Sequence, residues 1–576
     1  MKNVVRKLIP AVFLVLMLST MPLIAWADDS STSQNIDKDL AAAQIAADLT
    51  GGDVGEFLGT QSNGVSNSKI ASRVKCYEYS GQTFYDTAIS QAKAAYPHGA
   101  KVAIIAGPDQ AWIDALSAAG LAGCLDAPIL FSEKNSMNSA SLAALKQLGV
   151  VEVIIVGGPD AVGRGVESDL KKANIVIKKR LWGNQYYDTQ LAIFNYGVEN
   201  HLWNKDLIIL ATGTGFADAL SVSPIAYAMK APVFVTAPGN SLTVAQKAAW
   251  GTAAKDGYGK RVAIVGGPYV ISDAARQFAN QMRAIANGSG GAEWIWGQSQ
   301  YDTSSEIAKW ATGSNGFGFK WDYAAFTTGN EPWDALAGSV YQGKSKAVLL
   351  LANSSKEATV RIAGANKASI QNVRFFGGKW AMTPNVRMGV ADALDFPPAA
   401  LPNFKVFLDV GHGQNDSGNG YFDPGAIAAD GSWEHNLSED LVKLVAAQLR
   451  AKGVDYYIND SGPYKLRHSL AYSLQCDEII SFHFNAGGGS GSMTLIHSYN
   501  DNEYSATLQS KIHNRLVNGT GLWNLGPRRQ LVAILGGKLP AVLLETCFID
   551  NWNDLSQYYG RKSIIATEIA NGIMYD

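Results

Sequence analysis

The sequence has little of several features that mark common protein classes. Its 576 residues include only four cysteines, too few for a disulfide-rich scaffold. Cys76 and Cys124 fall in one region and Cys476 and Cys547 in another, so either pair could form a disulfide outside the cell, and four buried free thiols are the alternative. The formal net charge is only -2. Because nucleic-acid binding depends on clustered Lys and Arg that neutralise phosphates, no nucleic-acid partner is expected.

A long apolar run occurs only at the start of the chain. Lys2, Arg6 and Lys7 precede the run LIPAVFLVLML, and Ala25-Trp26-Ala27 follows as a small-x-small cleavage site. This pattern predicts a secretory signal peptide at residues 1–27, with an uncleaved membrane anchor as the alternative. No later segment is long and apolar enough to span a bilayer. We therefore expect an exported protein that has no membrane span after cleavage and is held at the cell surface noncovalently.

The chain is long enough for several hydrophobic cores, and its middle part repeats itself. After a polar linker at residues 28–72, the segment GQTFYDT at 81–87 returns as GNQYYDT at 183–189 and as GQSQYDT at 297–303. An Asp-Ala-Leu marker and then a glycine pair follow in every copy. The glycine pairs are Gly157-Gly158, Gly266-Gly267 and Gly377-Gly378.

Short β-branched runs alternate with segments of helical period between these markers, which predicts parallel α/β units with right-handed crossovers. The aspartate of each Asp-Ala-Leu marker is expected to cap a helix N-terminus. A glycine pair at a strand end allows a sharp turn, and its consecutive N–H groups could also receive an anion. Turn and cap chemistry alone is the alternative.

The triplicate pattern resembles the type 2 cell-wall-binding repeat of clostridial and related surface proteins. The resemblance implies three tandem Rossmann-like or toprim-like repeats, at residues 73–179, 180–292 and 293–394, packed around a pseudo-threefold axis. It also implies noncovalent anchoring on an anionic cell-wall polysaccharide, for which the six glycines are candidate contacts. The family commonly has Arg just before the Tyr of the first marker. Here that position holds Phe84, Tyr186 and Gln300, so a ligand contact through this arginine is not expected to be kept.

A Pro-rich linker at residues 395–403, expected to be an extended spacer, leads into a last segment at 404–576 that holds six of the eight histidines. Apolar strand-like runs there end near His412, His483 and Glu545. Reacting groups collect at the carboxyl ends of parallel strands, so we expect these three side chains to converge. Glu434 stands just before a helical pattern with Leu437 and Leu441 at core spacing. Two histidines and one glutamate, with a fourth position left to water, form a catalytic zinc set.

This constellation resembles the type 3 zinc-dependent N-acetylmuramoyl-L-alanine amidases, which are peptidoglycan hydrolases. Four family motifs are matched in order. They are DVGHG, Glu434 at the start of a Glu-x-x-Leu helix, SFHFNA and LLETCFIDN. The resemblance implies Zn2+ held by His412, Glu434 and His483, and a catalytic carboxylate at Glu545. Its tentative substrate contacts are Arg467 and Asn485. His435 is expected to face solvent or to support a ligand, and Cys547 to pack in the core.

The function that follows is a secreted, wall-anchored amidase of a Gram-positive cell wall. It would cleave the amide between N-acetylmuramic acid and L-alanine in peptidoglycan, with Glu545 moving the proton. Two alternatives stay open. One is a noncatalytic surface adhesin or lattice protein that only binds muropeptides, and the other is a zinc hydrolase of a different wall bond.

Overall fold

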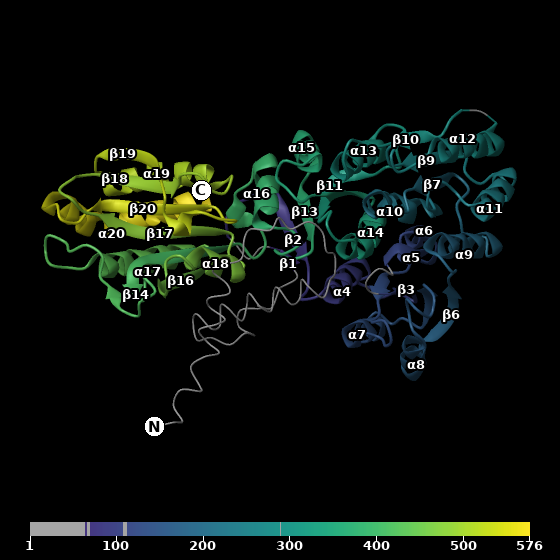
Figure 1. Cartoon of the computed structure of the whole chain (residues 1–576), viewed down its shortest axis with the longest axis horizontal. Coiled ribbons are helices and arrows are strands. Elements are labelled where there is room, and N and C mark those ends of the chain that lie inside the picture. The colour runs from purple at the N-terminus through teal and green to yellow at the C-terminus, as the bar shows by residue number, and fades with distance from the viewer. Residues whose placement is uncertain (1–63, 66–68, 108–111, 289, 576) are drawn as a thin grey trace, which may run out of the picture.

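The structure is a computed structural model that describes residues 64–65, 69–107, 112–288 and 290–575. The predicted signal peptide and most of the polar linker lie outside these residues. Three α/β repeats occupy one end of the molecule and the C-terminal domain occupies the other (Figure 1). None of the helices in the described part of the chain is long and apolar enough to cross a membrane.

Each repeat contains a parallel four-stranded sheet, and all three sheets share one strand order: β4-β3-β5-β6, β8-β7-β9-β10 and β12-β11-β13-β2. This arrangement confirms the predicted parallel α/β repeats. The strands are β3 (Val102–Ala106), β4 (Ile129–Phe131), β5 (Glu152–Val156), β6 (Val176–Leu181), β7 (Leu207–Ala211), β8 (Val233–Val235), β9 (Arg261–Val265), β10 (Glu293–Ile295), β11 (Lys320–Thr327), β12 (Ala347–Leu351), β13 (Asn372–Phe376) and β2 (Lys75–Tyr79), with β1 (Gly64–Val65) antiparallel to β2.

The first long strand among the described residues, β2, completes the third sheet. Strand β2 pairs with β13 in parallel, so that Cys76 lies opposite Val373. In the other two repeats the same place is taken by β6 and β10, which directly precede the next repeat's first helix. The three units are therefore joined in a ring, because the strand that leads into repeat one is held by repeat three.

One equivalent helix from each repeat lies at the centre of this ring, and the other helices of the repeats pack around the three sheets. The helices of the repeats are α4 (Phe84–Ala95), α5 (Trp112–Ala115), α6 (Ala118–Leu125), α7 (Ser139–Gln147), α8 (Arg164–Lys172), α9 (Tyr186–Glu199), α10 (Ala217–Met229), α11 (Val244–Lys255), α12 (Asp273–Asn287), α13 (Gln300–Thr312), α14 (Trp333–Ser345), α15 (Ala358–Ala365), η2 (Lys367–Ser369) and α16 (Pro384–Ala393). The equivalent helices α6, α10 and α14 contact one another pairwise, as expected around a pseudo-threefold axis. Close approach requires small residues there: a β-carbon on Gly123 would lie 2.0 Å from the Tyr227 carbonyl oxygen.

The Tyr-Asp-Thr marker starts the first helix of each repeat. The Thr83 and Ser299 hydroxyls accept from the N–H groups of Asp86 and Asp302, and each aspartate accepts from the backbone of its cap residue in return. Such a reciprocal box satisfies donors that the first helical turn leaves free. The preceding glycine is fixed by close approach, since a β-carbon on Gly81 would lie 2.1 Å from that of Asp86. The marker is thus explained by local structure.

The C-terminal domain is a seven-stranded sheet covered on both faces. Its elements are β14 (Lys405–Gln414), β15 (Phe422–Asp423), β16 (Asp455–Ser461), β17 (Glu478–Asn485), β18 (Ser492–His497), β19 (Asn524–Gln530), β20 (Ala541–Phe548), α17 (Glu434–Ala451), α18 (Arg467–Ser473), α19 (Ser505–Thr520), η4 (Ala533–Leu535) and α20 (Trp552–Met574). Strands β16, β14, β17 and β20 run parallel, and β18 is antiparallel to β20. Alternate residues of β14 serve different cores: Val406 packs with α17, α19 and α20, whereas Phe407 packs with α18.

The Pro-rich linker is buried, which corrects the expectation of an extended spacer. It contains η3 (Pro398–Ala400), and Phe396 and Leu401 join one hydrophobic core that runs from repeat three into the C-terminal domain. The apolar side chains of the linker are buried against both repeat three and the C-terminal domain, so the linker packs these two parts of the chain together. All four cysteines are free; Cys124 is partly buried and the other three are buried.

Candidate metal centre and active site

His412 lies near the end of β14 in a backbone conformation that few residues adopt. Its φ is 65° and that of Gly413 is 103°. Gly411, on the other side of His412, is required by close approach, because a β-carbon there would lie 2.5 Å from Cε1 of His483. Left-handed backbone at a non-glycine residue is strained and concentrates at functional sites. The two glycines therefore allow the imidazole to reach its partners.

The structure brings the three predicted ligands together. Glu434, the first residue of α17, has its Oε2 3.0 Å from Nε2 of His412 and its Oε1 3.1 Å from Nδ1 of His483. One ligand atom from each of the three residues lies within 4.8 Å of the others. Two imidazoles and a carboxylate at this separation fit a zinc ion with an open position.

The electrostatics of this cluster favour a cation. Burial opposes a charge on His412, but Glu434 and Asp423 outweigh it and raise the pKa of His412 to about 9. Burial likewise acts against the carboxylate of Glu434, yet its hydrogen bonds to His412 and His483 hold its pKa well below the usual range. Anionic Glu434, 4% exposed, is thus paired with positive charge.

Asp423 supports the cluster, a role that the sequence did not reveal. Its Oδ2 lies 3.0 Å from Nδ1 of His412, which fixes the tautomer that leaves Nε2 directed to Glu434. The available signal was the Asp-Pro-Gly turn after the histidine strand, which indicated only a restrained loop. Asp423 also joins a second set of possible ligands with His412 and Asp416.

Glu545 lies beside the cluster on the neighbouring strand. It is directly opposite His483 in the parallel pairing of β17 and β20, so the two side chains share one face of the sheet. Burial raises the pKa of Glu545 to about 7, lowered in part by His483 and raised further by Glu434. Its Oε2 is buried and has no hydrogen-bond partner among the described residues. A carboxyl group with such a pKa can both accept and release a proton near neutral pH.

Arg467 is a positioning residue, and the expectation that it contacts substrate is corrected. Its guanidinium is 2% exposed and all five of its N–H donors are used inside the protein. The acceptors are the carbonyl oxygens of Val410, His412 and Gly462 and the carboxylates of Asp409 and Asp416. Arg467 therefore holds the end of β14 in the shape that presents His412.

Asn485 ends β17, and its Oδ1 accepts from the N–H of Ala486. His435 does not face solvent: it is 8% exposed and its Nδ1 lies 3.0 Å from the carbonyl oxygen of Gly411. It supports the backbone next to His412, the second of the two roles expected for it. Cys547 is buried and its thiol pKa is raised by burial, as expected for a packing residue.

The glycine pairs of the repeats differ from the predicted anion nest. The N–H groups of Gly157, Gly266 and Gly377 donate to the backbone carbonyls of Leu181, Ile295 and Tyr79 in the adjacent strand. The first N–H of each pair is therefore already used, and two consecutive donors are not free for an anion. These three glycines have φ between 101° and 119°, and a β-carbon on each would lie within 3.3 Å of the Asp114, Asp218 or Asp334 carboxylate.

Asp218 and Asp334 are buried next to these glycines and Asp114 is half-buried beside its own, which corrects the expectation of a helix cap. Asp218 and Asp334 are second residues of α10 and α14, whose N-cap residues, Phe216 and Pro332, make no side-chain cap. The second glycine of the first two pairs, Gly158 or Gly267, lies against a tryptophan, Trp182 or Trp296. The marker residues thus form one small structural unit in each repeat.

Comparison with known proteins identifies the two parts. Residues 406–575 match the family described as N-acetylmuramoyl-L-alanine amidase, and residues 78–167, 180–276 and 295–387 match Cell wall binding domain 2. Over 493 residues the chain is 27% identical to N-acetylmuramoyl-L-alanine amidase LytC of Bacillus subtilis, which covers 83% of this chain and 89% of that protein. Among solved structures, Cwp6 from Clostridium difficile has a TM-score of 0.49 and 21% identity, covering 88% of this chain and 81% of that one. Cwp8 from the same organism has a TM-score of 0.47 and 22% identity, covering 56% and 52%.

Three α/β repeats in front of a domain with a His-Glu-His cluster define a modular wall hydrolase. The C-terminal domain belongs to the N-acetylmuramoyl-L-alanine amidase family and the repeats belong to the Cell wall binding domain 2 family. The chain is a peptidoglycan amidase with cell-wall-binding repeats. Both family predictions made from the sequence motifs are confirmed.

Proposed function

We propose that this chain is secreted after removal of residues 1–27, is held noncovalently on a Gram-positive cell wall, and uses zinc to cleave the bond between N-acetylmuramic acid and L-alanine. The observation that carries the proposal is the contact of Glu434 with both His412 and His483, at 3.0 and 3.1 Å. A noncatalytic muropeptide binder would need neither this cluster nor the carboxylate of Glu545 beside it.

The proposed zinc ligands are His412, Glu434 and His483. When bound, zinc supplies a lowered pKa for a coordinated water and polarises the scissile carbonyl. Asp423 holds His412 in the tautomer that can coordinate through Nε2. Arg467 fixes the carbonyl ends of β14, so the ligands are arranged before substrate arrives.

Glu545 is the proposed general base and acid. It takes a proton from the attacking water and delivers it to the leaving amine of L-alanine, so that the carboxyl group returns to its starting state. Its unpartnered Oε2 and a pKa of about 7 suit both steps. Asn485, at the end of β17, is a proposed substrate contact.

The repeats are the proposed anchor on an anionic wall polysaccharide. We propose repeats at 73–179, 180–292 and 293–394, followed by the 395–403 linker and an amidase domain at 404–576. Two of the candidate glycines lie where repeats two and three meet. Gly267 borders an open cavity there, and Gly266 lies beneath the Asp218 carboxylate.

The proposal is tested by product analysis on purified peptidoglycan. Wild type should release new N-terminal L-alanine, and both Glu545→Gln and chelator treatment should abolish the release. Asp423→Asn is the graded variant: it keeps the shape of the side chain and should weaken zinc binding about 10- to 100-fold. Unchanged release in Glu545→Gln and after chelation would refute the mechanism. New reducing ends or other free amines would instead assign a different wall bond.

A further inference from the structure

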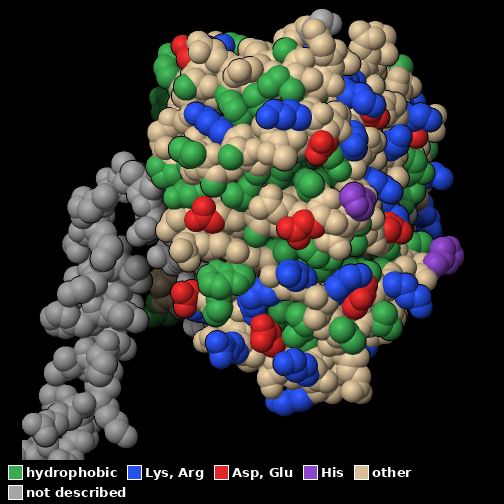
Figure 2. Space-filling view, turned by 90° about the vertical axis from the view of Figure 1, so that its right-hand side faces the viewer, with side chains coloured by type: hydrophobic (Ala, Val, Ile, Leu, Met, Phe, Trp, Pro, Cys, Tyr) green, Lys and Arg blue, Asp and Glu red, His purple; other side chains and the backbone are tan. Residues whose placement is uncertain are grey.

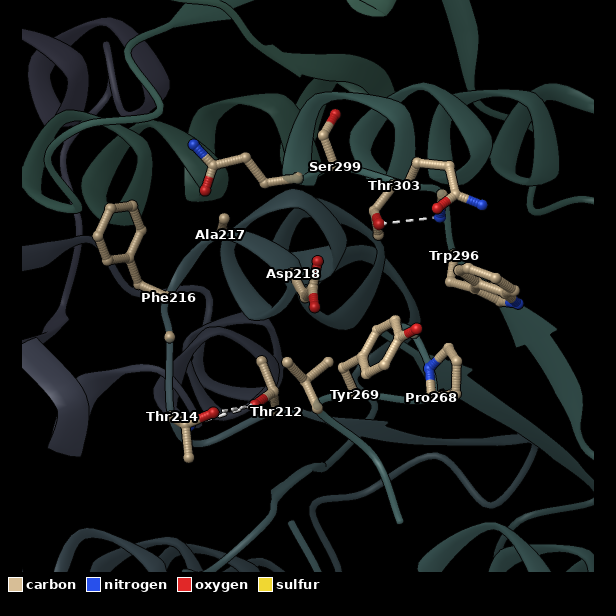
Figure 3. A pocket seen from close by; sticks show the side chains of 16 residues that line it. Thr212, Thr214, Phe216, Ala217, Asp218, Pro268, Tyr269, Trp296, Ser299 and Thr303 are labelled. Atoms are coloured by element: carbon tan, nitrogen blue, oxygen red, sulfur yellow. Dashed lines mark hydrogen bonds between the residues drawn. The ribbon is translucent and has the colours of Figure 1, made fainter. Parts of the chain in front are cut away.

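A cavity of about 360 Å³ lies at the seam between repeats two and three (Figure 3). Its sixteen lining residues come from three segments: the loop after β7 with the first turn of α10, the loop after β9, and the stretch that runs from the end of β10 into the first turn of α13. All three follow the carboxyl ends of parallel strands, where ligands of α/β proteins bind. The volume is in the range of small-molecule sites.

Asp218 lies in the middle of this cavity (Figure 3). The residue is 9% exposed, and nothing in the described part of the chain hydrogen-bonds to its carboxylate. Burial without a partner raises its pKa to about 6. A buried carboxylate without a donor is costly, so its presence in the lining of an open cavity indicates a donor from outside the protein.

Aromatic rings border the cavity around this carboxylate. Trp296 is fixed, because its indole stacks on Trp294 with ring centroids 5.4 Å apart and lies against Gly267. Tyr269 is 89% exposed and is one of the residues that line the cavity (Figure 3). These rings offer flat, partly apolar surfaces of the kind that the apolar face of a sugar ring covers.

The remaining polar lining is uncharged. Hydroxyl and amide groups come from Thr212, Thr214, Ser299, Thr303, Gln298 and Gln300. No Lys, Arg or His is among the lining residues, all of which the structure describes. A phosphate or carboxylate bound here would face Asp218 with no cationic partner, which is unfavourable. On the face of the repeat end shown in Figure 2, Lys and Arg are also interspersed with Asp and Glu.

We propose that this seam cavity binds an uncharged, hydroxyl-rich sugar ring, which donates a hydrogen bond to Asp218 and covers the rings of Trp296 and Tyr269. The inference rests on the proposed wall anchoring and makes it more specific. A neutral sugar unit of the polysaccharide is recognised at this seam, and the polymer's anionic groups lie outside it.

The seam between repeats three and one lacks the same elements. Ser80 stands where Trp182 and Trp296 precede the glycine of the first marker, and it donates to the buried Glu78 carboxylate. The loop after Gly378 is occupied by the C-terminal domain, through Lys379 and Trp380. In the described part of the chain, the aromatic, open cavity therefore distinguishes the seam between repeats two and three from the seam between repeats three and one, and the former is the seam to test.

The test is cosedimentation of the full chain with purified Gram-positive cell walls in the cold. Trp296→Ala and Tyr269→Ala should each weaken wall binding about tenfold, which corresponds to about 1.4 kcal/mol. Trp552→Ala and Tyr499→Ala, at exposed positions of the C-terminal domain, are the matched controls and should bind like wild type. Because Tyr269 is exposed, its loss should not unfold the chain.

Competition identifies the chemistry of the ligand. At least one of four sugars, tested singly, should release the wild-type chain from the walls: N-acetylglucosamine, N-acetylmannosamine, glucose or galactose. Inorganic phosphate at the same ionic strength should not release it. Release by phosphate alone, or wild-type wall affinity in both Trp296→Ala and Tyr269→Ala, would overturn the inference.

Amidase activity on a soluble muropeptide separates this inference from the proposed catalysis, and both ring variants should keep it. A wild type that binds walls through the seam but releases no L-alanine would refute the proposed catalysis alone. A wild type that does not bind walls would refute the anchoring and this inference together.

Discussion

The loop after the glycine pair has opposite surroundings in repeats two and three. In repeat two, Pro268 and Tyr269 border an open cavity. In repeat three, Lys379 is 6% exposed and its Nζ donates to the Asn403 and Gln475 carbonyl oxygens, at 2.6 and 2.8 Å, and to Asp477, at 2.5 Å. The next residue, Trp380, packs edge-on against Tyr472 with ring centroids 5.1 Å apart. One position of a repeated fold therefore faces solvent in one copy and another domain in the next.

An arginine four residues into the following helix shows the same contrast. In repeat two, Arg276 pairs with Asp273 and stacks over Trp294 on the surface. In repeat three, Arg387 is fully buried, donates to Glu78 at 2.8 Å and contacts the Pro402 carbonyl oxygen. Arg387 thus joins the N-terminal strand β2, repeat three and the linker. Repetition of sequence does not mean repetition of role, because the neighbours of each copy differ.

The largest expected effect is the difference in the free energy of unfolding between variants that each lack one of these two arginines. Arg387→Met leaves Glu78 buried without its cationic partner and should lower the free energy of unfolding by about 3–5 kcal/mol. Arg276→Met removes an exposed pair and should cost at most about 1 kcal/mol. Denaturant midpoints of the two variants measure the difference. Equal midpoints would mean that the surroundings of repeats two and three do not differ energetically.

A somewhat smaller effect is expected at the loop itself. Lys379→Met removes the cation from a buried pair, but Asp477 keeps the Lys405 N–H as a donor, so we expect a loss of about 3 kcal/mol. Pro268→Ala, at the corresponding solvent-facing position of repeat two, should change stability by about 0.5 kcal/mol or less. Limited proteolysis at the linker provides a second measurement. If Lys379→Met remains as resistant as wild type, this pair does not hold the two domains together.

The buried aspartates of repeats two and three, Asp218 and Asp334, should give different dependences of stability on pH. Burial raises the pKa of Asp218 to about 6, and burial together with Glu331 raises that of Asp334 to about 7. Both exceed the ordinary value of 3.8, so the stabilising contribution is fully present below about pH 4 and is lost as the pH rises through the folded-state value. Between about pH 5 and about pH 6 the loss at Asp334 should be on the order of 1 kcal/mol.

Asp334→Asn should therefore flatten the dependence of stability on pH, and Asp218→Asn should flatten it less and over a lower range. Asp206→Asn, on the surface, serves as the control. Thermal unfolding at several pH values measures all three variants. A steeper dependence in Asp334→Asn than in wild type would contradict the assigned direction.

The His-Glu-His cluster could be predicted from sequence because it depends on short local patterns. His412 and His483 lie near the carboxyl ends of β14 and β17, Glu434 opens α17, and parallel strands bring such ends to one edge. The positions of Asp423 and Arg467 could not be predicted in the same way. Whether Arg467 faces substrate or the inside of a loop depends on how β14 bends at His412, which is a property of the folded backbone.

The pairing of strands that lie far apart in the sequence also could not be predicted from sequence patterns. The periodicity of residues 75–79 indicates a strand, but the choice of β13 as its partner depends on ring closure across three repeats. Likewise, nothing in the sequence around Lys379 distinguishes a surface loop from a domain contact. The sequence predicts helix caps at the three aspartates because Asp is common at helix N-termini. In the structure their carboxylates instead lie against the glycines, in space that a β-carbon would fill.

The most direct test of the metal centre is the zinc content of the purified full chain and its variants, measured by mass spectrometry. We predict one zinc per chain in wild type and loss of zinc in His412→Ala and His483→Ala. His483 separates this assignment from the alternative set of His412, Asp416 and Asp423. Full zinc content in His483→Ala would contradict the proposed ligands and the mechanism that depends on them.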